Sequence, residues 1–313
     1  MVQDLVFSID GYMRHPLDYR ELKYAKFVPT GVYADHALSL RLNPGRVEHQ
    51  GVLNACVGSV VSSGAEMLIN NAIQLSRRDA WDRAKVAMRT RGNVGVYLNV
   101  GCDMVLDGLP SEDDVPYDDQ VIEHWTPDDV QRYDTALAHQ LIIGDVVTGT
   151  IDALTAGHPV VFGFGVNIAA FTTALQKRGL LDKYSHNRST YNLWHAMVAW
   201  GYEGSRGLVL CRNSWGMAAD DSNGMLLPDM TAGDIAFTVD AFRDLVYEAR
   251  ELTPELVLPN DPRKAVVTLT EWTGGVGNWT QTPITTHEMT QSGWIGVEAP
   301  GNTTQFVRID VPR

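Results

Sequence analysis

The sequence predicts an α+β fold, with helices in the first half of the main domain, strands in its second half and a small C-terminal β-rich appendage. The helical part is indicated by residues 57–75, where apolar or small residues recur at intervals of three and four. The strand-rich part is indicated by VVFGFGV, HAMVAWGY and GLVLCRNSW, short apolar runs separated by Gly and polar residues. The appendage is indicated by AVVTLTEW, SGWIGVEA and QFVRIDV, three strand-like segments among turns rich in Gly, Thr and Asn.

Composition and charge narrow the classes of function that fit this chain. Its 313 residues, 44% of them hydrophobic, are enough for a sizeable core. A formal charge of −13 argues against nucleic acid as a partner, because phosphate binding relies on clustered Lys and Arg. The sequence has no apolar run long enough to span a membrane, and its first residues lack the pattern of a signal peptide. We therefore expect neither nucleic acid nor membrane as a partner.

The three cysteines, Cys56, Cys102 and Cys211, form neither a disulfide pattern nor a metal-binding pattern. An odd number without paired spacing fits a reducing compartment. Neither CxxC nor HExxH occurs, so we expect no metal and no other cofactor. Cys102 and Cys211 lie among apolar neighbours and are expected to pack in the core, because free cysteine is among the most buried residue types.

The other elements of the main domain follow in chain order. The periodic run after Cys56 predicts a helix with Asn54 as its N-cap, and SRRDAWDRAKVAMRTRG predicts a second, more polar helix. GLPSEDDVPYDD has no period and predicts a loop. TIDALTAGHP predicts a short helix that ends at Gly157 and Pro159, and DIAFTVDAFRDLVYEAREL predicts a further helix after the strands.

The stretch LVLPNDPRK, with two prolines and no apolar period, predicts a linker. It divides the chain into a main domain at 1–253, a linker at 254–263 and a small β-rich module at 264–313. The module is interpreted as a recognition element, an oligomer contact or a cover for the main domain. Three tryptophans are open to two interpretations, core packing as the commoner case and protein or glycan contact through the module: Trp272, Trp279 and Trp294.

A cysteine at the start of a helix has a specific chemical meaning. If the helix begins at Cys56, the thiol lies beside unpaired backbone N–H groups and the positive end of the helix dipole. Such surroundings favour the thiolate and lower cysteine pKa values to roughly 3.5–7.5. Acyl transfer by a thiolate also needs a proton donor for the leaving group, usually an oriented histidine, and hydrogen-bond donors for the oxyanion.

Among nine histidines, His195 differs because NLWHAMVAWGY places it at the start of an apolar strand. A histidine there is either a core residue with a satisfied hydrogen bond or a functional one. RNSWG follows, with Asn213 eighteen positions later across an expected hairpin. An asparagine on the neighbouring strand can bind the ring and fix its tautomer, and Trp215 can cover that bond and exclude water.

QGVLNAC, HAMVAWGY and RNSWG resemble the three signature blocks of papain-like cysteine peptidases, in the order Gln, Cys, His, Asn. His195 follows Cys56 by 139 positions, within the family's interval of about 130–150. Asn213 follows Cys56 by 157 positions, which is consistent with a modest loop insertion. DGYMRHPLDYRELKY is similar to the lead-in of bacterial and viral members. GLPSEDDVPYD and ALTAGHPVVFGFGV resemble further family segments, so the resemblance covers residues 10–250.

The resemblance implies a papain-like two-lobe fold: a lead-in at 1–45, a helical left lobe at about 46–125 and a β-barrel-like right lobe at about 126–253. It implies a peptidase acting on a protein or peptide substrate. The implied roles fall on four residues: Cys56 as nucleophile, His195 as general acid and base, Asn213 as the residue that orients the imidazole, and Gln50 as oxyanion donor together with the backbone N–H of Cys56. Trp194 and Val160 resemble positions that line the main side-chain pocket, which we then expect to favour small or aliphatic residues.

The sequence also departs from the family pattern. Asn54, Ala55 and Val57 stand where the family commonly has Gly, then Ser or Ala, and an aromatic residue after the nucleophile. Leu53 replaces the disulfide cysteine of secreted members, and Met225 stands where tyrosine is usual. The lead-in starts almost at Met1, so we expect no inhibitory pro-segment, and a cytoplasmic or virion-associated location.

Two alternatives to a peptidase stay open at this point. The same acyl-enzyme could serve an amidase, deamidase or transpeptidase, which differ only in the acceptor of the acyl group. A papain-like scaffold could also act as a structural or binding module, for example in a virus particle or a host-interaction complex. Asn54, Val57 and the missing second tryptophan of the Asn block favour the scaffold.

Overall fold

The computed structural model describes residues 12–13, 25–28, 38–123, 129–176, 179–182, 191–216 and 227–254, and the backbone of four later strands between 265 and 309. The chain divides into two compact units, Met1–Val257 and Leu258–Arg313. Met225 and most of the expected linker lie outside the described residues. No helix among the described residues is long and apolar enough to cross a membrane.

The helices of the first unit are those of a mixed α+β fold, as predicted. They are α1 (Cys56–Leu68), α2 (Arg77–Ala87), α3 (Leu98–Leu106), α4 (Val146–Thr155), α5 (Ile168–Gln176), α6 (Val239–Leu245) and the short 3-10 turn η4 (Gly204–Arg206). Its strands are β1 (Tyr12–Met13), β2 (Lys26–Val28), β3 (Ser39–Arg41), β4 (Val96–Tyr97), β5 (Ala138–Gly144), β6 (Val160–Val166), β7 (Leu180–Leu181), β8 (Leu193–Glu203), β9 (Leu208–Arg212), β10 (Asp234–Thr238) and β11 (Val246–Thr253).

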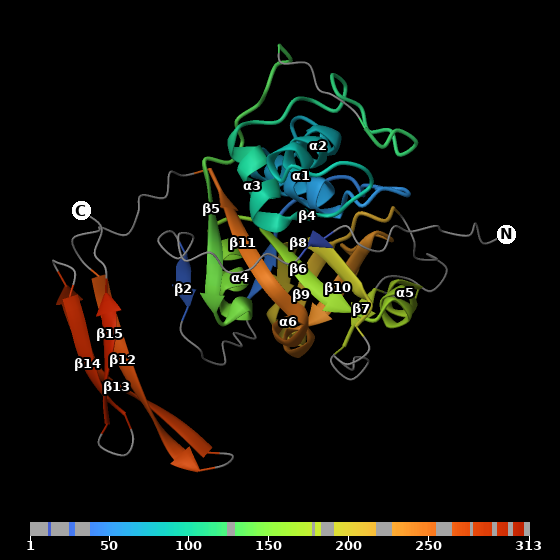
Figure 1. Ribbon diagram of the computed structural model, residues 1–313. Helices are drawn as coiled ribbons and strands as arrows, with labels where there is room; N and C mark the ends of the chain where they lie inside the picture. Colours follow the sequence, from blue (N-terminus) through green and yellow to red (C-terminus); the bar gives the residue numbers. More distant parts are fainter. Residues whose placement is uncertain are drawn as a thin grey trace. The chain divides into compact units, whose positions relative to one another are not determined.

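Nine strands form one sheet in the order β2-β5-β11-β6-β8-β9-β10-β7, with β3 paired to β8. Its central pairs are antiparallel, while β2 with β5 and β10 with β7 are parallel. The described strands follow an open path and do not close into a ring. Helices α1, α2 and α3 gather above the sheet in Figure 1, so the expected helical and β-rich lobes are both present.

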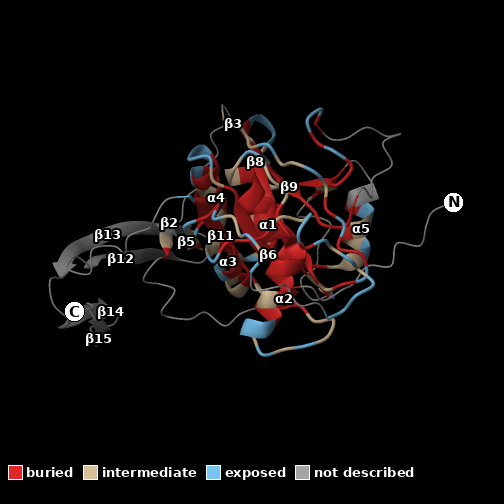
Figure 2. Cartoon of the chain, turned by 90° about the horizontal axis from the view of Figure 1, so that it is seen from above, coloured by how far each residue is buried: buried red, intermediate tan, exposed pale blue. Residues whose placement is uncertain are grey.

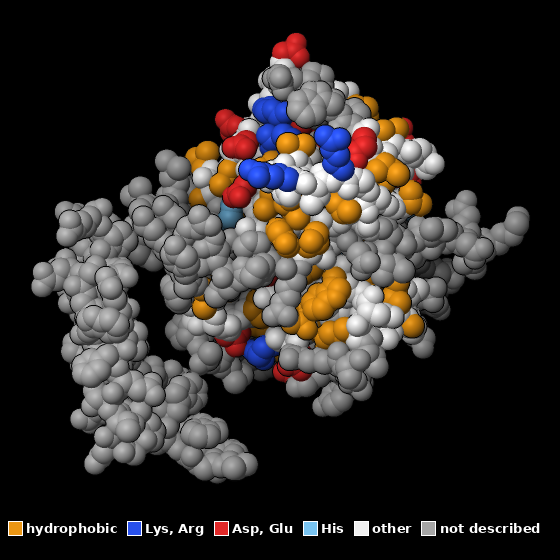
Figure 3. Space-filling view, in the orientation of Figure 1, with side chains coloured by type: hydrophobic (Ala, Val, Ile, Leu, Met, Phe, Trp, Pro, Cys, Tyr) orange, Lys and Arg blue, Asp and Glu red, His pale blue; other side chains and the backbone are white. Residues whose placement is uncertain are grey.

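The sheet separates two apolar cores, because successive side chains of a strand point to opposite faces. Val161 packs with α1 and the other helices of the upper lobe, whereas Val160, Phe162 and Phe164 pack on the opposite face with α4, α5 and α6. Helix α1 lies in the buried middle of the unit (Figure 2). On the outer face in Figure 3, charged side chains gather over the helical lobe and apolar ones lie below it.

Small residues let α1 approach its neighbours closely, which fixes the position of its first residue. A Cβ added at Gly58 would lie 2.6 Å from the carbonyl oxygen of Arg77, and one at Gly64 would lie 2.8 Å from Leu252. The helix begins at Cys56 as predicted, but its N-cap is Ala55 and carries no side-chain bond. The predicted cap was wrong: the Asn54 amide instead donates to Asn93 O at 2.8 Å, which ties this turn to the loop before β4.

The helix predicted over DIAFTVDAFRDLVYEAREL was also wrong. Only α6 in its middle is helical, and the flanking segments are strands β10 and β11. β10 pairs with β9, and β11 lies between β5 and β6. Pairing with strands distant in sequence therefore overrides the local helical pattern.

The other two cysteines pack in the core as predicted. Cys102 lies in α3 and Cys211 in β9; both are fully buried, and neither forms a disulfide. Burial raises the pKa of the Cys211 thiol well above its usual value. Neither thiol is therefore expected to react readily in the native state.

The second unit is rich in β-structure, as predicted. Strand β12 (Ala265–Gly275) pairs antiparallel with β13 (Asn278–Met289), and β14 (Gly293–Ala299) pairs antiparallel with β15 (Thr303–Ile309). The side chains of Trp272, Trp279 and Trp294 lie outside the described part, so protein or glycan contact through this unit stays a prediction.

A buried carboxyl group in α1 gives a prediction for stability. Burial raises the pKa of Glu66 from 4.5 to about 7, although its Oε1 accepts a hydrogen bond from the backbone N–H of Leu75 at 2.7 Å. A raised native pKa means that stability is lost as the pH rises from 4.5 through 7. We expect Glu66→Gln, which keeps the acceptor, to unfold at the same urea concentration as wild type at pH 4.5. At pH 8 the shift of about 2.5 pKa units predicts up to about 3 kcal/mol more stability for the variant. Parallel pH profiles of the two proteins would contradict this prediction.

Candidate active site

Cys56 stands at the first position of α1, where the helix meets the sheet. Backbone N–H groups of Ala196, Val57 and Cys56 itself lie near its thiol and favour the thiolate, which lowers the pKa against the larger effect of burial. Ala196 directly follows His195 on β8, so the fold brings the sulfur to within one residue of the candidate histidine. The backbone that follows His195 on β8 therefore lies beside Cys56, 139 positions earlier in the chain.

His195 is held in one orientation by Asn213. The Nε2 atom of its ring lies 2.7 Å from Asn213 Oδ1, and that oxygen also accepts the backbone N–H of Ser214 at 2.8 Å. Because a carboxamide oxygen only accepts, the imidazole carries its proton on Nε2 and leaves Nδ1 as an acceptor. Trp215 lies against the ring, with centroids 4.7 Å apart, as expected for a residue that shields this bond from water.

Gln50 is fixed beside the same strand end by its own hydrogen bonds. Its Oε1 accepts the hydroxyl of Ser214 at 2.7 Å, and its Nε2 donates to Leu53 O at 2.9 Å. Its backbone N–H donates to Ser214 O at 2.7 Å. One N–H of the amide group is therefore committed to Leu53, and the second is a further donor. Ser214 connects both carboxamides, since it also donates to Asn213.

Burial decides the protonation states at this site. Cys56 is 0% exposed, and its desolvation raises the thiol pKa to about 12 despite the three N–H groups that favour the thiolate. His195 is 1% exposed, and burial lowers its pKa to about 4, although the bond to Asn213 favours the charged ring. In this conformation both groups are neutral at pH 7. The expectation of a lowered thiol pKa is therefore wrong for the closed site, because desolvation outweighs the helix terminus.

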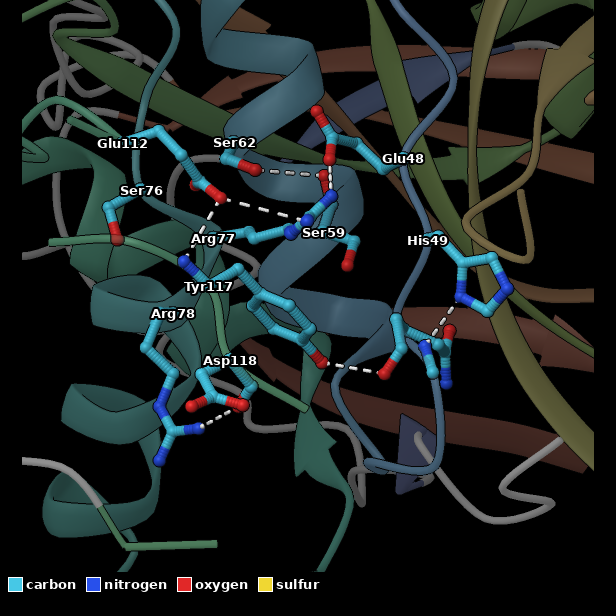
Figure 4. Close-up of polar contacts among 12 residues, drawn as sticks. Glu48, His49, Ser59, Ser62, Ser76, Arg77, Arg78, Glu112, Tyr117 and Asp118 are labelled. Atoms are coloured by element: carbon cyan, nitrogen blue, oxygen red, sulfur yellow. Dashed lines mark hydrogen bonds and ion pairs between the residues drawn. The ribbon is translucent and has the colours of Figure 1, made fainter. Parts of the chain in front are cut away.

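A network of charged residues supports the loop that carries Gln50 (Figure 4). The hydroxyl of Tyr117 donates to Gln50 O at 2.7 Å, and the backbone N–H of Tyr117 donates to Glu112 at 3.1 Å. Arg77 stacks over the Tyr117 ring at 4.2 Å and forms an ion pair with the buried Glu48. The backbone of Glu48 in turn accepts the N–H of Gly216 at 2.8 Å, next to the Asn213 segment. The loop is thus tied to both lobes.

A cavity of about 430 Å³ lies beside this network and is lined by polar residues: His49, Arg77, Tyr117, Asp118 and Asp119. Tyr117 forms part of the cavity wall, and its hydroxyl donates a hydrogen bond to the backbone oxygen of Gln50. The cavity therefore neighbours the loop of Gln50 rather than the thiol of Cys56. We regard the thiol and imidazole, not this cavity, as the chemical centre, because the cavity holds no nucleophile.

Of the two expected pocket residues, the structure places one near the site and one away from it. Trp194 is half-buried and packs against the core that contains Cys56, and its ring lies tilted against that of Tyr247, with centroids 4.9 Å apart. Val160 is fully buried in the core on the other face of β6. Its place in a side-chain pocket stays a prediction.

Comparison with solved structures shows which architecture this is. Xylellain, a cysteine protease from Xylella fastidiosa, superimposes with a TM-score of 0.59 at 16% identity, over 82% of this chain and 100% of that one. The chain has the papain-like fold. The procathepsin B S9 of Trypanosoma congolense matches with a TM-score of 0.55 at 14% identity, over 79% of this chain and 87% of that one. The digestive procathepsin L 3 of Tenebrio molitor matches with a TM-score of 0.52 at 17% identity, over 74% of this chain and 77% of that one.

No protein-family model matches the sequence, and a comparison with curated proteins finds no significant match. The papain-like fold is therefore visible in the structure at identities too low for the sequence as a whole to reveal it. The resemblance in the sequence is confined to short blocks around Gln50, Cys56, His195 and Asn213, and their roles stay a prediction.

Three residues near the candidate site were given no role from the sequence. Ser214 lies inside the quoted RNSWG block and Tyr117 inside the quoted loop, but neither was given a role. Tyr12 lies in the lead-in and is buried against the sheet. Only Ser214 had a usable signal, since a hydroxyl next to an orienting Asn can bind a second buried amide.

Proposed function

We propose that the protein is a cysteine peptidase that hydrolyses peptide bonds through an acyl-enzyme on Cys56. The observation that carries the proposal is the 2.7 Å hydrogen bond between His195 Nε2 and Asn213 Oδ1. The next residue, Ala196, has its backbone N–H near the Cys56 thiol. A core histidine needs a partner for its ring but no neighbouring thiol. An imidazole with one nitrogen fixed and the other an acceptor is suited to take the proton of that thiol.

The proposed reaction uses each residue at a stated atom. His195 Nδ1 takes the proton of Cys56 as the sulfur attacks the carbonyl carbon. The resulting oxyanion accepts hydrogen bonds from the Cys56 backbone N–H and the second N–H of Gln50 Nε2. His195 then gives its proton to the leaving amine, and the C–N bond breaks to leave a thioester. Water, deprotonated by the same nitrogen, cleaves the thioester and releases the acid and the free thiol.

The neutral, buried pair is a resting state in this proposal. A thiol with a pKa of about 12 and an imidazole with a pKa of about 4 do not form an ion pair. Admission of water or substrate polar groups would weaken desolvation and bring the two pKa values together. The proposed enzyme therefore needs the covering of Cys56 to move before it reacts.

The test is cleavage of a broad peptide library, with Cys56→Ala as the matched control. Paired fragments from wild type and none from the variant would support peptide hydrolysis. Deamidated products or amine adducts would support the amidase, deamidase or transpeptidase alternative instead. Wild-type protein that neither cleaves the library nor takes up an epoxide inhibitor at Cys56 would refute the proposal.

The second candidate, a structural or binding scaffold, is favoured by one observation: Cys56 is 0% exposed. A scaffold would need the fold but not the thiol. In a cell-based or binding assay of the protein, an unchanged effect of Cys56→Ala would support the scaffold, and loss of the effect would support the peptidase.

A further inference from the structure

The cavity of about 430 Å³ beside the Gln50 loop has an uneven distribution of charge. The guanidinium group of Arg77 in its wall is paired with the buried carboxylate of Glu48. Asp118 and Asp119 line the same cavity and form no ion pair with any residue that the structure describes. Because the positive charge of the wall is paired and the two negative charges are not, the cavity attracts a cation.

Two N–H donors of the wall are also without an acceptor among the described residues. Arg77 is 9% exposed, and its buried Nε–H has no hydrogen-bond partner there. His49 accepts the backbone N–H of Gly51 on Nδ1 at 2.8 Å, so the proton of its neutral ring is on Nε2. A Cβ added at Gly216 would overlap the His49 ring, which therefore rests on this backbone. The wall thus fits a cation that also carries a hydrogen-bond acceptor.

The donors and the size of the cavity favour an organic cation over a metal ion. No group of three or more His, Cys, Asp or Glu residues in the described part of the chain could hold a metal. The volume of about 430 Å³ is also far larger than the share of a single water molecule in the liquid, about 30 Å³. A guanidinium group presents several N–H donors in one plane, a geometry that matches carboxylate oxygens. A carbonyl oxygen on the same molecule would accept the Nε2 proton of His49.

The wall of the cavity is connected to the backbone of Gln50 on both sides. The hydroxyl of Tyr117 donates to Gln50 O at 2.7 Å (Figure 4). His49 precedes Gln50 in the chain, and its ring holds the N–H of the residue that follows, Gly51. Asp119 lies against Gly51, where a Cβ would overlap its carboxylate and where φ is +58°. A ligand between His49 and Asp119 would therefore hold the loop from two directions.

We propose that this cavity binds a small organic cation with a guanidinium group and a carbonyl acceptor, and that the bound cation holds the Gln50 loop in place. The guanidinium group contacts Asp118 and Asp119, and the carbonyl oxygen accepts the proton of His49 Nε2. Binding does not depend on the proposed peptidase activity, because no wall residue is the nucleophile or the general base. An effect of the cation on hydrolysis does rest on the proposed function, since it acts through Gln50.

The first experiment titrates the full chain with N-acetylargininamide by isothermal calorimetry. N-acetylcitrullinamide is the matched probe, because it keeps the shape and the carbonyl groups but has no charge. We expect the arginine compound to bind at least about 10-fold more tightly, since two carboxylates favour the charged group. Added salt should weaken its binding, because the carboxylates are exposed to solvent screening. Equal affinities of the two compounds, or no binding of the arginine compound at millimolar concentration, would overturn the proposal.

The second experiment locates the bound cation with substitutions that keep side-chain volume and remove charge. We expect Asp118→Asn and Asp119→Asn each to raise the Kd of N-acetylargininamide about 3-fold, and the double variant to raise it about 10-fold. Asp113→Asn is the matched control, because Asp113 is exposed in the same loop but does not line the cavity. Its Kd should stay within about 2-fold of wild type. A double variant that binds as tightly as wild type would place the compound elsewhere and refute the site.

Hydrogen exchange over residues 48–56 tests the effect on the loop. Saturating N-acetylargininamide is expected to slow exchange of the Gly51 N–H, which His49 Nδ1 accepts, by at least about 3-fold. Binding without slower exchange would contradict the claim that the cation holds the loop. Slower exchange with an unchanged kcat on peptides would support the cation site and count against the role of Gln50 in hydrolysis. The cation site and the proposed function can therefore fail separately.

Discussion

A His195→Gln variant is expected to lose at least about 10⁴-fold of kcat/KM on the best peptide of the library, because its side chain cannot carry the proton from thiol to leaving amine. Glutamine retains an N–H that can donate to Asn213 Oδ1, which now lies 2.7 Å from the ring. Its smaller volume loosens the contacts with Phe164, Phe171 and Trp215. The loss of activity is therefore to be measured together with the thermal midpoint.

Asn213→Ala is the companion variant. It retains the imidazole but removes the acceptor that fixes its tautomer, so we expect an activity between those of wild type and His195→Gln. The pH profile of Cys56 alkylation should change in both variants. A His195→Gln protein that keeps a tenth of wild-type kcat/KM would show that another group moves the proton.

The parts of the fold that the sequence predicted are those whose pattern is local. The run after Cys56 repeats every three to four residues and forms α1, and the Gly-bounded apolar run at β6 forms a strand. The prediction of one helix from Asp234 to Thr253 was wrong, because only α6 within this segment is helical. The strands on either side are stabilised by partners such as β5, about a hundred residues earlier in the chain, and no local window contains that information.

The candidate site also has features that a local pattern predicts and features that depend on contacts distant in sequence. Gln50, Cys56, His195 and Asn213 occur in short blocks whose order and spacing carry information. In the structure His195 is bonded to Asn213, and Ser214 links Asn213 to Gln50. The contact between Tyr12 and Glu248 spans 236 positions and joins two residues that have no motif. The protonation states were not predictable either, because a helix terminus is visible in sequence but the burial that outweighs it is not.

Gln50→Ala is expected to lower kcat about 100- to 1000-fold while leaving the rate of Cys56 alkylation within a few-fold of wild type. The reason is that the amide is proposed to stabilise an oxyanion that forms only when a carbonyl is attacked. Alkylation creates no such anion. A ground-state role of Gln50 in packing would instead change both rates, or the thermal midpoint, together.

Two control variants distinguish the N–H donor of the Gln50 amide from the residue that holds this amide in place. Gln50→Glu keeps the shape and the acceptor for the Ser214 hydroxyl, now bound at 2.7 Å, but replaces the amide donor with a negative charge. It should be at least as impaired as Gln50→Ala, because like charges would face each other at the oxyanion. Ser214→Ala keeps the amide and removes only its support, so a loss of about 10-fold or less is expected. If Ser214→Ala were as impaired as Gln50→Ala, the effect would lie in the orientation of the loop and not in the N–H of Gln50.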